Sequence, residues 1–109
     1  MKDSKQLIIQ FKIDGHDAPE NLDALINIEE ELIAACQKTG VGQVDGHDIG
    51  SGEMNIFIIV SDWTQGVSFL KNYMKTALWA KKAVAAKRQL DGKYEVIWPE
   101  NRSGSFKIT

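Results

Sequence analysis

The sequence contains one cysteine and two prolines among its 109 residues, and no apolar run approaches the length of a membrane-spanning helix. Cys36 has no second cysteine with which to form an internal disulfide, so the fold needs no oxidising compartment. The apolar residues near the N-terminus are interrupted by Lys12 and Asp14, which excludes the hydrophobic region of a secretory signal peptide. Because a bilayer span needs about 20 apolar residues, these absences predict a cytoplasmic protein without membrane contacts.

Charged residues are unevenly distributed along the chain. Residues 1–62 carry 12 acidic and 4 basic side chains, whereas residues 63–109 carry 3 acidic and 9 basic ones. We expect such a chain to have faces of opposite sign, which can steer a charged partner. The basic part lacks interleaved exposed aromatics and a recognisable nucleic-acid module, so nucleic-acid binding is not predicted.

The first part of the chain has the periodicity of a strand followed by a helix. Residues 7–13 alternate, which predicts a strand with one face on the core. A helix is predicted from Pro19 to about Lys38, because proline suits a first turn and Gly40 suits a helix end. The apolar stripe expected on this helix comprises Leu22, Leu25, Ile26, Leu32, Ile33 and Cys36.

A β-hairpin is predicted next, with strands over residues 43–49 and 54–60. Gly50 and Gly52 are expected to supply the positive φ of its tight turn. A second helix is predicted to begin after Asp62 and to continue to Leu78, since Asp62 and Gln65 form a capping-box pattern.

The segment from residue 79 to residue 90 is compatible with either helix or strand. The Asp91-Gly92 pair suits a type I′ turn, so we predict a second hairpin with strands over residues 83–90 and 93–98. The resulting order is strand, helix, strand, strand, helix, strand, with one added final strand. This order predicts a ferredoxin-like α+β sandwich over residues 1–100, with both helices on one face of an antiparallel sheet. Residues 101–109 are expected to be a polar tail or a short edge strand.

Glu29 falls near the middle of the apolar stripe of the first helix. At 100° per residue it lies within about 40° of Leu22 and Ile33. A carboxylate in this position should either find a partner or have a raised pKa.

Both histidines occur in the same tetrapeptide, Asp-Gly-His-Asp, at residues 14–17 and 45–48. Imidazole and carboxylate groups are metal ligands, so a metal site would require His16 and His47 to converge. The alternative is two independent turns, in which Asp and Gly are favoured for their backbone behaviour. We expect no metal and no cofactor.

An acid–base enzyme is a second alternative, with His47 acting beside Asp45, Asp48 or Glu53. In a regular strand over residues 43–49, Asp45 and His47 would share one face and Asp48 would lie on the other. No motif positions a nucleophile, because Ser51 lies in a glycine-rich turn and Cys36 lies on an apolar stripe. The sequence therefore favours a non-enzymatic protein and predicts no catalytic residue.

A protein-interaction role needs fewer assumptions. The partner-binding residues that we predict are Asp45, His47, Asp48, Glu53 and Trp79. The carboxylates, reinforced by Glu30 and Glu31, would form an acidic patch that complements a basic partner. Trp79 lies off the stripe of the second helix, so it is the tryptophan expected to be exposed as an anchor.

The run from Gly40 to Glu53, containing Val-Asp-Gly-His-Asp-Ile-Gly-Ser-Gly-Glu, resembles a family of small uncharacterised bacterial proteins, as does the segment from Tyr94 to Glu100. This resemblance implies a fold and a bacterial cytosolic origin, but no catalytic residues. In size and charge the chain is also similar to immunity proteins of polymorphic toxin systems. That similarity implies an inhibitor that places its acidic hairpin on a toxin or nuclease. A dimeric regulatory module that binds a small ligand is a third alternative, suggested by the fold alone.

Overall fold

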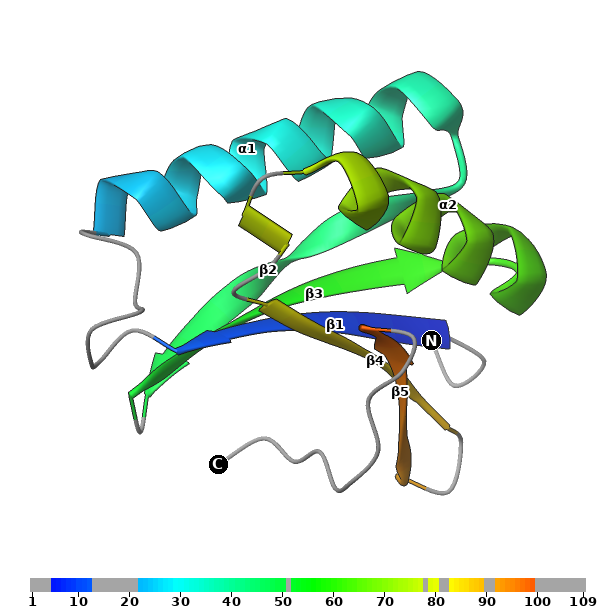
Figure 1. Cartoon of the computed structure of the whole chain (residues 1–109). Coiled ribbons are helices and arrows are strands. Elements are labelled where there is room, and N and C mark those ends of the chain that lie inside the picture. The colour runs from blue at the N-terminus through cyan, green and yellow to red at the C-terminus, as the bar shows by residue number, and fades with distance from the viewer. Residues whose placement is uncertain are drawn as a thin grey trace.

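The computed structural model describes residues 5–12, 22–50, 52–77, 79–80, 83–89 and 92–99, without the side chains of residues 22–24. Two helices and five strands lie in these ranges (Figure 1). In chain order they are β1 (Lys5–Lys12), α1 (Leu22–Thr39), β2 (Gly42–Gly50), β3 (Glu53–Val60), α2 (Trp63–Thr76), β4 (Ala83–Arg88) and β5 (Tyr94–Trp98).

The strands form one antiparallel sheet with the order β2-β3-β1-β4-β5. Both helices cover the same face of this sheet, which gives two layers (Figure 1). The predicted α+β sandwich is therefore confirmed. The first four strands have the order expected of two interleaved strand–helix–strand units, and β5 extends the sheet beyond β4. Among the described residues, β2 and β5 therefore form the two opposite edges of the sheet.

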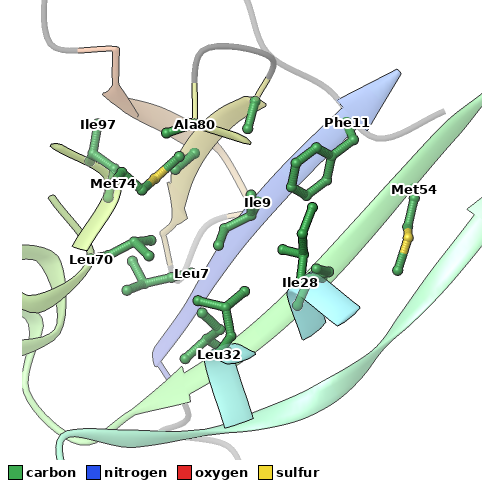
Figure 2. Packing of buried hydrophobic residues seen from close by; sticks show 14 of the residues in the cluster. Leu7, Ile9, Phe11, Ile28, Leu32, Met54, Leu70, Met74, Ala80 and Ile97 are labelled. Carbon is green, nitrogen blue, oxygen red and sulfur yellow. The ribbon is translucent and has the colours of Figure 1, made fainter. Parts of the chain in front are cut away.

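The core lies between the sheet and the helices. The alternation of β1 places Leu7, Ile9 and Phe11 on the helix side, where none of them has exposed surface. Figure 2 shows these three side chains pointing toward Ile28 and Leu32 of α1 and toward residues of α2. The other core residues of the two helices include Leu25, Cys36, Leu70 and Met74.

Two apolar residues of α1 depart from the predicted stripe. Ile33 is 37% exposed, whereas Ile28, which the prediction omitted, belongs to the core. The buried line follows positions 25, 28, 32 and 36, which are three and four residues apart. Ile33 lies to one side of this line and is partly exposed to solvent.

The predicted helix ends are largely confirmed. The backbone N–H of Gln65 donates to the Asp62 side chain at 2.8 Å, as the capping pattern requires. α1 ends at Thr39, and the N–H of Gly40 donates to the Cys36 carbonyl at 2.9 Å. α2 ends at Thr76, two residues earlier than predicted.

The second predicted hairpin is also confirmed, as residues 83–88 form a strand and not a continuation of α2. The N–H of Gln89 donates to the Lys93 carbonyl at 2.7 Å, which closes the turn between β4 and β5. In the part of the chain that the structure describes, no helix has the length and apolarity needed to cross a membrane. The expectations for Ile13, for the helix start at Pro19 and for residues 101–109 fall outside the described residues.

Candidate functional site

The first hairpin, which carries most of the predicted site residues, contains a β-bulge in β2. Val44 pairs with Ile58 and Gly46 pairs with Phe57, so Asp45 is an extra residue with no partner in β3. Gly46 has φ +122°, a backbone conformation that residues with a Cβ rarely adopt. The expectation of a regular strand, with Asp45 and His47 on one face, is therefore wrong.

The turn of this hairpin also differs in detail from the prediction. Gly52 has φ +77°, as a tight turn requires. Gly50, in contrast, does not adopt a positive φ, because it continues β2 and pairs with Glu53.

The bulge determines which face of the sheet His47 occupies. His47 lies opposite Ile56, whose side chain is in the core, and directly opposed residues of an antiparallel pair point to the same face. His47 is therefore on the helix side of β2, together with Val44. Without the extra residue, the alternation would have placed His47 on the other face.

His47 forms a hydrogen bond with the carboxylate of Glu29 of α1. Its Nδ1 lies 2.9 Å and 3.0 Å from the two carboxylate oxygens of Glu29. The Glu29 side chain is only 12% exposed and that of His47 is 34% exposed. Since an ionised carboxylate only accepts, Nδ1 of His47 is the donor and its Nε2 remains outside this contact. The prediction that Glu29 finds a partner is thus confirmed.

Asp48 and Glu53 lie on the opposite face of the sheet, within a polar network. The Asn55 amide donates to Asp48 at 3.0 Å, and the Gln10 amide donates to Asn55 at 3.0 Å and to Glu53 at 3.3 Å. Asn55 is only 1% exposed, so this network satisfies a buried amide across three strands. The sequence did not predict the network, because its members meet only through the register of β1, β2 and β3.

In one form of the acid–base alternative, His47 acts together with Glu53. The sheet separates them, since Glu53 shares the face of Asn55 while His47 shares that of Ile56. Among the described residues there is also no group of three metal-ligating side chains that could hold an ion. The convergence of His16 with His47 falls outside the described residues.

Trp79 follows α2 and is only partly exposed. Its ring centroid lies 5.5 Å from that of Phe11 and 6.0 Å from that of Tyr73, and its Nε1 is buried without a hydrogen bond. The expectation that Trp79 is exposed is therefore wrong, because it is partly buried against the core. Its role as a partner anchor stays a prediction.

Two exposed apolar side chains flank the Glu29–His47 pair. Ile49 is 45% exposed and Ile33 is 37% exposed, and these are the large hydrophobic residues that the described part of the chain leaves open to solvent. Ile49 lies two residues beyond His47 on β2, and Ile33 lies one turn beyond Glu29 on α1. Because α1 and β2 run in opposite directions, the two isoleucines are at opposite ends of this hydrogen-bonded pair (Figure 1).

Comparison of the chain with family models, curated proteins and solved structures found no match.

Proposed function

We propose that the protein is a non-enzymatic interaction domain that docks its β2 edge and the adjoining face of α1 on a basic protein surface. The most specific form of this proposal is an immunity or inhibitor protein that covers the active site of a toxin or nuclease. We name this docking region the β2 surface and define it by Glu29, Ile33, Asp45, His47 and Ile49, together with Asp48 on the opposite face of the same edge strand.

The observation that carries the proposal is the position of Ile33 and Ile49. Both exposed isoleucines lie on the two elements that also supply the exposed acids Glu30, Asp45 and Asp48. Glu31, which was expected to reinforce this patch, instead accepts a hydrogen bond from Tyr73 of α2. An apolar area with a polar rim is typical of protein-binding surfaces, and in this proposal the two isoleucines supply the apolar part. The carboxylates would steer a basic partner, and the isoleucines would provide the apolar contacts that hold it.

The edge position of β2 also supports docking through side chains. An edge strand has unpaired backbone groups, and a bulge together with charged side chains discourages another strand from adding there. β2 has both features, in the Asp45 bulge and in the exposed Asp48. A partner is therefore expected to contact the side chains of this edge more than its backbone.

Charge reversal at the bulge tests the proposal with little risk to the fold. Asp45 is exposed and has no partner in β3, whereas Asp48 and Glu53 accept hydrogen bonds from Asn55 and Gln10. The tagged protein would be used to capture partners from a lysate of its host at low and high salt. Asp45→Lys should weaken capture of a basic partner by on the order of tenfold, and Ile49→Ser should weaken it independently of salt.

Glu95→Lys is the matched control, because Glu95 is an exposed acid on the opposite edge strand, β5. It should leave the capture unchanged. If Asp45→Lys and Ile49→Ser capture as much of the partner as Glu95→Lys does, the β2 surface is not the docking site and the proposal fails.

A further inference from the structure

A concave region lies between the start of α2 and the β4–β5 hairpin. It has a volume of about 210 Å³, below the roughly 300–1,000 Å³ of pockets that take drug-sized ligands. We name it the α2 cavity. Its lining residues are Trp63, Thr64, Val67, Lys71, Lys87, Glu95 and Ile97.

The lining combines an apolar wall with two cations. Trp63, Val67 and Ile97 pack against the core, so this wall is part of the rigid body of the domain. The ammonium group of Lys87 lies 4.7 Å from the centre of the Trp63 ring, a cation–π distance that holds the charge at the cavity. The cavity thus has a fixed apolar part and a positioned positive charge.

No carboxylate of the described ranges forms an ion pair with Lys71 or Lys87, although Glu95 lies directly opposite Lys87 in the sheet. The Glu95 carboxylate instead accepts from the Gln89 amide at 3.2 Å. Two lysines that form no ion pair with a described carboxylate can attract an anion from solution, in competition with the Glu95 side chain that also lines the cavity.

The first turn of α2 adds to this positive potential. It begins at Trp63, includes Thr64 and contains no acidic side chain, so the positive end of the helix dipole is balanced only by the cap residue Asp62. The Thr64 hydroxyl is a further donor at the rim.

We propose that the α2 cavity binds a small organic anion, in which a carboxylate or phosphate group is attached to a compact apolar body. The anionic group contacts Lys71 and Lys87, and the apolar body contacts Trp63, Val67 and Ile97. This inference is independent of the β2 surface, because the cavity adjoins β5 at the opposite edge of the sheet.

Titration of the isotopically labelled protein with four probes, monitored by NMR chemical shifts, tests this inference. Benzoate carries a carboxylate on an aromatic ring, and phenyl phosphate carries a phosphate on the same kind of ring. Benzyl alcohol is the neutral analogue, and inorganic phosphate is the anionic group without the ring. Benzoate, phenyl phosphate or both should give saturable shifts of the Trp63 indole and of the Thr64 and Val67 amides. Comparison of the two separates a carboxylate ligand from a phosphate ligand. If neither anion gives saturable shifts, or if neutral benzyl alcohol binds as tightly as the anions, the proposal is wrong.

Lysine variants give the second half of the test. Lys87→Gln and Lys71→Gln should each weaken binding of the anionic probe by about fivefold, the upper end for a partly exposed ion pair. Lys87→Arg should restore binding, which separates the loss of charge from a loss of packing on Trp63. Lys38→Gln, on the last turn of α1, is the control and should bind as the unchanged protein does. Equal affinity in all three glutamine variants would overturn the assignment of the anion to the α2 cavity.

Discussion

Nδ1 of His47 lies within hydrogen-bond distance of both carboxylate oxygens of Glu29, at 2.9 Å and 3.0 Å, and this contact joins the helix layer to the edge of the sheet. The two residues are 18 positions apart and belong to α1 and β2. Removing one partner leaves the other partly buried without its hydrogen bond, which costs more than the bond itself contributes.

We therefore expect His47→Ala to lower the free energy of unfolding by about 1 kcal/mol, since the pair is charge-assisted but partly exposed. Urea denaturation of His47→Ala, Glu29→Ala and the double variant would measure this loss and the coupling between the two side chains. Additive effects of the two single changes would show that the pair contributes nothing to stability.

The bulge should depend on Gly46 more than on any other residue of β2. A Cβ at Gly46 would meet nothing within 4 Å, so the cost of Gly46→Ala comes from its φ of +122° alone. We expect a loss of about 1–3 kcal/mol in stability. The matched control is Gly50→Ala, because Gly50 is equally open but has no positive φ. Similar unfolding midpoints for the two variants would contradict the assignment of strain to Gly46.

Gly66→Ala should be destabilising for a different reason, the close approach of α2 to β3. A Cβ at this buried position would lie 2.7 Å from the Val60 side chain, so either the helix or the valine must shift. Overpacking of this kind costs about 1–3 kcal/mol. Thermal denaturation of Gly66→Ala and of the double variant with Val60→Ala would check this, because the smaller neighbour should recover part of the loss.

Tyr73 should make stability fall at alkaline pH. Burial raises the pKa of its phenol, as does its hydrogen bond to the Glu31 carboxylate. The unfolded chain therefore releases this proton at lower pH than the folded one. The contribution of Tyr73 to the free energy of unfolding is complete below the ordinary tyrosine pKa of about 10. It is lost as the pH rises above that value.

Stability measured between neutral and alkaline pH would test this expectation in the Tyr94→Phe background, where Tyr73 is the remaining tyrosine. Addition of Tyr73→Phe should flatten the alkaline decline. Reversible ionisation of Tyr73 near its ordinary pKa in the folded protein, seen in its ultraviolet absorbance, would contradict the prediction.

Cys36 should react slowly with thiol reagents in the native state. It is only 2% exposed, and burial raises the pKa of its thiol, which lowers the fraction of reactive thiolate. We expect alkylation at neutral pH to be fast only in denaturant. Without denaturant, its rate should be limited by the local opening of α1. Mass spectrometry of the native protein after exposure to iodoacetamide would show rapid, complete labelling if this view of Cys36 is mistaken.

The elements of this fold could be predicted from local patterns in the sequence. The alternation of Leu7, Ile9 and Phe11 predicted β1, and the spacing of Asp62 and Gln65 predicted the start of α2. Both patterns depend on residues close together in the chain, since strand periodicity and helix capping are local. The order of these elements then limited the arrangement to a split sheet with both helices on one face.

The bulge, and with it the face that His47 occupies, was decided by tertiary structure. An isolated Asp-Gly pair suits a turn as well as a bulge, and only the pairing of Val44 with Ile58 and of His47 with Ile56 makes Asp45 the extra residue. The position of Glu29 on an apolar stripe made a partner for its carboxylate one of the two outcomes expected from the sequence. The packing of α1 on β2 decided that the partner is His47, because contacts between layers depend on register and helix position and not on the neighbouring residues in the chain.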